Sequence, residues 1–120
     1  MNLAPVADVN TNPDNPVIRE RAYGSNPEQV SRIVAAVVEG MESEGVAAVL
    51  KHFPGHGDTY DDTHHSSATV SHDLERLMEV ELLPFEAGVK AGATGVMAGH
   101  ISVPEVVGDD APATFSQELL

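Results

Sequence analysis

The feature that most constrains the fold is the alternation of short apolar stretches with longer amphipathic ones. Apolar runs stand at residues 3–9, 46–50 and 94–98. Apolar residues at helical spacing over 25–45 predict one helix, and a second helical region begins near Ser71. Strands that are apolar throughout and alternate with helices are typical of a parallel sheet with helices outside it. The sequence therefore predicts an α/β fold of parallel strands alternating with helices.

Both predicted helices carry local signals at their ends. Ser25 and Glu28 have the spacing of a capping box at the start of the first helix, and Gly45 suits its C-terminal stop. In the second region, Pro84 should break or restart the helix because proline has no backbone N–H to donate. Gly92 is expected to close it.

The polar chemistry is concentrated between the second strand and the second helical region. Residues 51–70 show almost no apolar periodicity, which indicates a long loop. Five of the six histidines lie between His52 and His72. Because loops that follow parallel strands lie at the carboxyl edge of the sheet, where ligands bind, we expect the functional site there.

Carboxylate, imidazole and cationic side chains can carry chemistry at this edge of the sheet. Asp62 and His64 are two residues apart, so the carboxylate can hold one ring nitrogen and leave the other to exchange a proton. The same spacing also fits a hydrogen bond that only stabilises the loop. Lys51 at the end of the strand and Arg21 before the first helix can donate to hydroxyls or an anion. Either cation can equally be an ordinary surface charge.

A metal site is the alternative for the same stretch. Nitrogen and oxygen ligands are offered by His52, His56, Asp58, Asp62, His64 and His65. The intervening Pro54-Gly55 disfavours a helical turn that would bring the first two together. Because the chain has no cysteine, thiolate sites and disulfides are excluded. We expect no metal and no cofactor.

The charge balance restricts the partners. Nineteen acidic residues against six basic ones give a formal charge of −13. This charge opposes binding to nucleic acid phosphates and to anionic lipid headgroups. No apolar run approaches the length of a membrane span. We expect neither nucleic acid nor membrane as a partner, and a cytoplasmic protein, with secretion left open.

Taken as one string, the histidine-rich segment resembles the signature of glycoside hydrolase family 3. Lys-His-Phe-Pro-Gly-His-Gly-Asp-Thr stands at 51–59 and Asp-Thr-His at 62–64. The resemblance is strongest to the β-N-acetylglucosaminidases of that family. Further segments similar to the family lie at 3–10, 15–24, 81–85 and 96–101. The resemblance therefore covers essentially the whole chain.

The resemblance implies a fold and a set of roles. The family's fold is a (β/α)8 TIM-type barrel, of which residues 1–120 would form a middle portion truncated at both ends. Arg21, Lys51 and His52 would bind the hydroxyls of an N-acetylglucosamine ring. His64 would be the general acid/base, oriented by Asp62, in a retaining hydrolysis that releases terminal β-linked N-acetylglucosamine or N-acetylhexosamine.

One family feature has no counterpart in the chain. The family's nucleophile is an aspartate on a later strand, and Asp8 belongs to a different motif and is not assigned that role. The resemblance therefore implies that this chain alone is inactive. A partial barrel also leaves open sheet edges, through which we expect self-association. A phosphorylase of the same family and a non-catalytic sugar- or metal-binding α/β module stay open. So does the aglycone, either peptidoglycan fragments or chitin-derived sugars.

Overall fold

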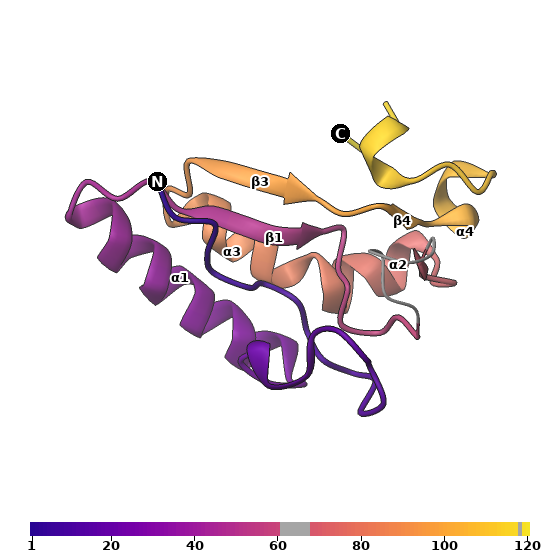
Figure 1. Ribbon diagram of the computed structural model, residues 1–120, viewed down its shortest axis with the longest axis horizontal. Coiled ribbons are helices and arrows are strands. Elements are labelled where there is room, and N and C mark those ends of the chain that lie inside the picture. The colour runs from indigo at the N-terminus through magenta and orange to yellow at the C-terminus, as the bar shows by residue number, and fades with distance from the viewer. Residues whose placement is uncertain (61–67, 118) are drawn as a thin grey trace.

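Parallel strand pairs with helices beside them build the chain in the computed structural model, which describes residues 1–60, 68–117 and 119–120. Strand β1 (Val49–Phe53) pairs with β3 (Gly95–Ala98). Strand β2 (Ala68–Thr69) pairs with β4 (Ile101–Ser102), and both pairs are parallel (Figure 1). The predicted parallel α/β arrangement is confirmed.

Two helices pack side by side on the β1–β3 pair. Helix α1 (Pro27–Ser43) contacts α3 (Leu83–Lys90), as Figure 1 shows. Between them and the strands lies one apolar core of eight buried residues: Ala7, Val9, Val30, Val34, Val38, Ala48, Leu50 and Phe85. Gly88 permits this close packing, because a Cβ there would lie 2.6 Å from Leu50 Cδ2. The carboxyl end of β1 is thus held on a packed base.

The first predicted strand is less regular than expected. Residues 3–9 run parallel to β1, but only isolated bridges join them, at Asn2↔Ala48 and Val6↔Lys51. Pro5 lies inside the stretch and has no N–H to donate, which interrupts the ladder. Its carbonyl still accepts from Lys51 N at 3.2 Å. The segment is therefore an extended edge beside β1 rather than a full strand.

Strand β1 lies further along the chain than predicted. The apolar run 46–50 suggested a strand ending before Lys51, whereas β1 continues to Phe53. Backbone pairing carries it on: Lys51 pairs with Val6 on one side and with Met97 on the other. The ladder to β3 is irregular between Lys51 and Phe53. Lys51 and His52 therefore belong to the sheet and not to the loop after it.

The helix ends follow the predictions with one correction. Asn26, not Ser25, caps α1, because its side chain accepts from Gln29 N at 2.9 Å. Gly45 has φ +71° and ends the helix as expected. Pro84 lies in the first turn of α3, so the predicted restart is confirmed.

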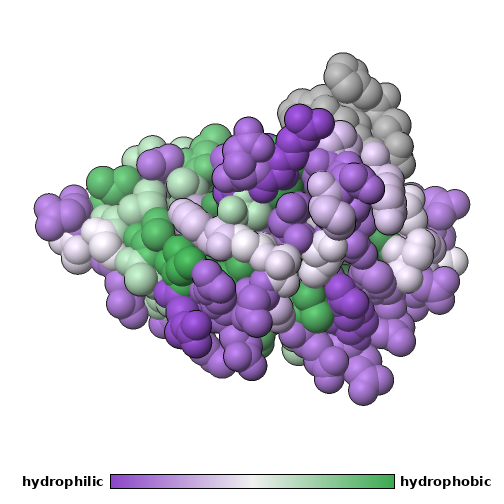
Figure 2. All heavy atoms as spheres, turned by 90° about the horizontal axis from the view of Figure 1, so that it is seen from below, coloured by the Kyte–Doolittle hydropathy of each residue, from purple (hydrophilic) through white to green (hydrophobic). Residues whose placement is uncertain are grey.

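The remaining elements are short. They are η1 (Arg19–Arg21), α2 (Leu74–Arg76), the π-helix η2 (Leu77–Glu81), α4 (Pro104–Val107) and η3 (Ala113–Phe115). Among the residues with described structure, no helix is long and apolar enough to cross a bilayer. Hydrophilic groups cover most of the face in Figure 2, with apolar groups in smaller patches between them.

Candidate functional site

The site is organised around a buried carboxylate that the sequence analysis did not select. Asp8 is 0% exposed and lies at the end of the extended first segment. Its Oδ2 accepts from His52 Nδ1 at 2.7 Å. Its Oδ1 accepts from the backbone N–H of His52 at 3.1 Å and of His56 at 2.7 Å. One carboxylate therefore fixes both the His52 ring and the backbone that follows it.

The second ring nitrogen of His52, Nε2, lies next to Arg21. The distance from Arg21 Nη2 to His52 Nε2 is 3.5 Å, the outer limit of a hydrogen bond. Arg21 ends η1, and its Nη1 also reaches the carbonyl of Val17 at 3.4 Å. Two residues predicted to bind the sugar, 31 positions apart in sequence, thus lie together.

Lys51, the third predicted binding residue, precedes His52 in β1. Its backbone carbonyl accepts from Ala7 N at 2.6 Å, so the sheet fixes its main chain. The side chain is half-buried. Within residues 1–60, 68–117 and 119–120 its ammonium makes no hydrogen bond or ion pair, which leaves its donors available to a ligand.

Two asparagines of the first loop hold the turn after β1. Asn15 Nδ2 donates to the carbonyl of His56 at 2.7 Å, and Asn12 Nδ2 donates to that of Thr59 at 3.0 Å. Asn15 Oδ1 also accepts from the N–H groups of Val17 and Ile18, where η1 begins. Asn15 therefore links the segment that carries Arg21 to the segment that carries the histidines.

A second carboxylate–imidazole pair lies further along the same segment. His72 Nε2 and Asp58 Oδ2 are 2.6 Å apart, and each side chain is a quarter exposed. His56 Nδ1 pairs with the hydroxyl of Thr59. Asp62, His64 and His65 lie outside the described residues, so the predicted acid/base pair is not placed.

Of the six candidate metal ligands, His52, His56 and Asp58 lie among the described residues. No group of three or more His, Asp or Glu side chains in the described part of the chain is arranged to hold a metal ion. His52 and His56 approach edge to face, with ring centroids 5.9 Å apart.

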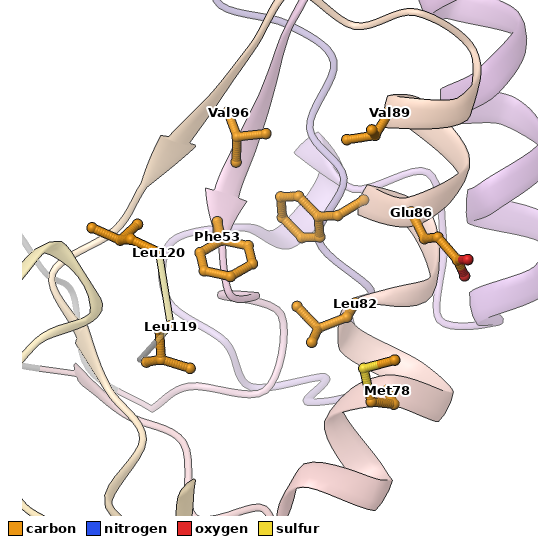
Figure 3. A pocket seen from close by; sticks show the side chains of 9 residues that line it. Phe53, Met78, Leu82, Glu86, Val89, Val96, Leu119 and Leu120 are labelled. Atoms are coloured by element: carbon orange, nitrogen blue, oxygen red, sulfur yellow. The ribbon is translucent and has the colours of Figure 1, made fainter. Parts of the chain in front are cut away.

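An apolar hollow of about 430 Å³ lies apart from this polar cluster. Figure 3 shows Phe53, Leu82, Val89 and Val96 around it, on β1, β3 and the helices beside them. Glu86 contributes the one carboxylate of the lining, and it pairs with Lys90. Without further polar groups, this hollow is a packing surface and not a site of chemistry.

Sequence reasoning missed Asp8, Asn12 and Asn15. Asp8 is a single carboxylate in an apolar run that runs parallel to β1, so it reaches the same sheet edge as His52. That placement was a usable signal. The two asparagines look like ordinary turn residues, and nothing in the sequence indicates that their amides bind main-chain atoms 41 and 47 positions away.

Comparison with known proteins adds to this geometry. The profile of the glycosyl hydrolase family 3 N-terminal domain matches residues 1–120. The β-hexosaminidase A of Pseudoalteromonas piscicida is 40% identical over 131 residues, which is all of this chain and 22% of that protein. The chain spans 35% of the length of the β-hexosaminidase of Xanthomonas oryzae pv. oryzae (strain MAFF 311018), so it covers only part of both relatives.

Solved structures agree in fold. A family 3 β-N-acetylglucosaminidase from Paenibacillus sp. str. FPU-7 superposes with a TM-score of 0.97 at 47% identity, over 100% of this chain and 23% of that one. NagZ from Neisseria gonorrhoeae, in complex with N-trifluoroacetyl-D-glucosamine, gives 0.90 at 34% identity, over 99% and 34%. With the family profile matched along its whole length, this α/β chain, part of a TIM-type barrel, belongs to glycoside hydrolase family 3.

Proposed function

We propose that this chain supplies the sugar-binding part of a retaining glycoside hydrolase that releases terminal β-linked N-acetylglucosamine or another N-acetylhexosamine. Residues 1–120 would form the middle of its catalytic barrel. The observation that carries the proposal is that Arg21 lies next to the His52 ring, which the buried Asp8 holds in place. The relatives' names, β-hexosaminidase and β-N-acetylglucosaminidase, point to the same class of substrate.

The sugar cluster, formed by Arg21, Lys51 and His52, suits a neutral, hydroxyl-rich ligand. The Arg21 guanidinium is always charged and only donates hydrogen bonds. Lys51 offers three donors, and the His52 ring has one nitrogen not engaged by Asp8. A sugar hydroxyl can accept from one group and donate to another, so adjoining donors and an acceptor recognise it well.

The proton transfer is assigned from the family motif. His64 would protonate the leaving glycosidic oxygen in the first step and deprotonate water in the second, oriented by Asp62. Each step inverts the configuration at the anomeric carbon, so the two steps together retain it. A carboxylate nucleophile is also required, and none of the family positions matched here supplies one. We therefore expect no turnover from this chain alone.

Sugar binding by the 120-residue chain tests the first part. Isothermal titration with N-acetylglucosamine should show binding that weakens roughly tenfold in Arg21→Gln, the loss of about one charged hydrogen bond. Arg32→Gln is the matched control, because Arg32 lies exposed on α1. Equal loss in both variants, or tighter binding of zinc than of sugar, would contradict the proposal.

Turnover tests the second part. The chain alone should not hydrolyse a chromogenic N-acetylglucosaminide. A hybrid with the rest of the barrel supplied by a related hexosaminidase should hydrolyse it and lose activity in His64→Ala. Product that forms only with added phosphate would indicate a phosphorylase instead. Hydrolysis by the chain alone would overturn the assignment of a missing nucleophile.

We also propose that the isolated chain self-associates. Among the described residues, β3 pairs only with β1, and Val96 on β3 is 45% exposed. Sedimentation should show oligomers that grow with added salt, which screens the charge of −13. Val96→Glu should reduce them, whereas Val46→Glu, in the turn after α1, should not. A monomer at every salt concentration would contradict this expectation.

A further inference from the structure

We propose that Asp8 is a positioning residue that holds His52 as the Nδ1–H tautomer, so that Nε2 faces the ligand as a hydrogen-bond acceptor. The inference deepens the proposed function and rests on it for the ligand, although the tautomer itself does not. It assigns the role of hydrogen-bond acceptor to His52, whereas the family roles of Arg21, Lys51 and His52 do not say which group donates and which accepts.

The argument begins with the carboxylate. Asp8 is 0% exposed and receives three donors from two residues: His52 N, His56 N and His52 Nδ1. An ionised carboxylate can only accept hydrogen bonds. At 2.7 Å, the His52 Nδ1 must therefore carry a proton.

Arg21 decides the state of the other ring nitrogen. Its Nη2 lies 3.5 Å from His52 Nε2, and a guanidinium has no acceptor. If Nε2 carried a proton, two donors would face each other, and a doubly protonated ring would place two cations together. With Nδ1 protonated and Nε2 bare, both neighbours are satisfied. The surroundings on the two sides thus select the same neutral tautomer.

The other groups around the ring do not reverse this choice. The His56 ring meets it edge to face at a centroid distance of 5.9 Å. Lys51 adjoins His52 in the chain. Among the described residues, the charged side chains within hydrogen-bond distance of this ring are Asp8 at Nδ1 and Arg21 at Nε2, and Arg21 favours a bare Nε2.

A bare Nε2 constrains the ligand. A sugar hydroxyl placed between His52 and Arg21 would donate its proton to Nε2 and accept from the guanidinium. A group that only accepts, such as fluorine or a carboxylate, would find no donor on the ring. The pair therefore selects a hydroxyl that acts in both directions, which suits a neutral sugar better than an anion.

The experiment uses ring-¹⁵N-labelled histidine in the 120-residue chain. Long-range ¹H–¹⁵N correlation in mildly alkaline buffer, where free imidazole is neutral, reports which ring nitrogen is protonated. The wild-type His52 should show a protonated Nδ1 and a bare Nε2. A protonated Nε2 would overturn the proposal without any variant.

Asp8→Asn gives the sharper test. The two backbone N–H groups cannot change, so the amide oxygen must stay on them and the amide nitrogen must face the ring. His52 should then switch to the Nε2–H tautomer, and N-acetylglucosamine should bind roughly tenfold more weakly. Asp58→Asn is the control: it alters the His72 signals and leaves those of His52 unchanged. Asp8→Asn that folds and keeps the wild-type His52 signature would contradict the proposal.

The two proposals fail separately. Sugar that binds to a chain whose His52 is protonated at Nε2 would overturn the role of Asp8 and support sugar binding. A bare Nε2 whose signal does not respond to N-acetylglucosamine would support the Asp8 assignment and overturn sugar binding at this cluster. Each deoxyfluoro analogue of N-acetylglucosamine replaces one hydroxyl with fluorine. If all of these analogues bind as tightly as N-acetylglucosamine, the role of His52 Nε2 as an acceptor is overturned.

Discussion

The side-chain amide of Asn15 donates to the main-chain carbonyl of His56 at 2.7 Å, across 41 residues of sequence. Asn15 is 1% exposed, so this bond is made away from water. The same side chain accepts from Val17 and Ile18, at the start of the turn that carries Arg21. One buried amide therefore sets the position of both loops that form the candidate site.

Replacing Asn15 should loosen both loops at once. Asn15→Ala leaves the N–H groups of Val17 and Ile18 without their acceptor and removes one of the two donors to the His56 carbonyl, which keeps the Thr59 hydroxyl. We therefore expect a loss of about 3 kcal/mol in the free energy of unfolding. Urea denaturation measures it. Asn15→Asp keeps the acceptor for Val17 and Ile18 and loses the donor to the His56 carbonyl. A loss below about 1 kcal/mol in both variants would show that the bonds are unimportant.

Gly57 is required because the turn passes very close to the first segment. A Cβ at this position would lie 1.9 Å from the carbonyl oxygen of Val9, which is main chain and cannot rotate away. Gly57→Ala should therefore cost about 2–3 kcal/mol or more in unfolding free energy. It should also shift the backbone amide resonances of residues near His56. Unchanged stability would mean that the two segments separate easily.

Gly40 should respond in the opposite direction to the same change. It lies in the last part of α1, and apart from its own helix backbone no described heavy atom lies within 4 Å of its would-be Cβ. Gly40→Ala should stabilise the chain by about 0.5–1 kcal/mol, because alanine loses less backbone entropy in a helix. Thermal unfolding of Gly40→Ala and Gly57→Ala side by side checks both signs.

Arg19 holds a backbone conformation that suits glycine. Its φ is +44°, in the left-handed region that costs a side-chain-bearing residue about 1–2 kcal/mol. Arg19→Gly should therefore raise the midpoint of thermal unfolding. The matched control is Glu20→Gly in the same turn, whose φ is not positive and which should be destabilised by about 0.5–1 kcal/mol. Loss of stability in both variants would refute the assignment of strain.

Glu42 should make the stability depend on acid pH. The N–H of Ala48 and then the hydroxyl of Thr94 donate to its carboxylate and lower its pKa below the usual range for glutamate. Because the folded pKa lies below the unfolded one, the contribution is present above the unfolded pKa and is lost as pH falls through the folded pKa.

Thermal unfolding across the acid range measures this contribution. Glu42→Gln should flatten the loss of stability below the ordinary pKa of glutamate, because the amide does not titrate. Glu39→Gln, an exposed neighbour on α1, should follow the wild type. Parallel curves for wild type and Glu42→Gln would contradict the role of the carboxylate.

The sequence predicted the order of elements better than their limits. Fully apolar runs and helical spacing are properties of local stretches, so α1, α3 and the parallel direction of the strands followed from them. The end of β1 did not, because Lys51 and His52 are polar and backbone pairing with Val6 and Met97 keeps them in the strand. Ser25 and Asn26 are both good caps and adjoin in sequence, so the pattern did not distinguish them. In the structure, Asn26 is the cap.

The site was predictable only in part. The family motif selected Arg21, Lys51 and His52, and the structure places Arg21 beside His52. The Asp62–His64 assignment stays a prediction. Asp8 was passed over because its partner His52 lies 44 residues away, and only the shared sheet edge connects the two. Such long-range pairs depend on strand register, which a single sequence does not state.

Asn12 and Asn15 hold the turn at 56–59 through the carbonyl oxygens of His56 and Thr59, and Asn15 also lies 3.4 Å from the Thr59 hydroxyl. The hydrogen bonds of these two asparagines do not involve the side chains of Asp58 or Tyr60. Tyr60, 74% exposed just past the turn, and Asp58 can therefore be randomised in a library while both asparagines and Gly57 are kept. The scaffold separates what holds the turn from what it presents, which makes this segment a starting point for engineering new selectivity.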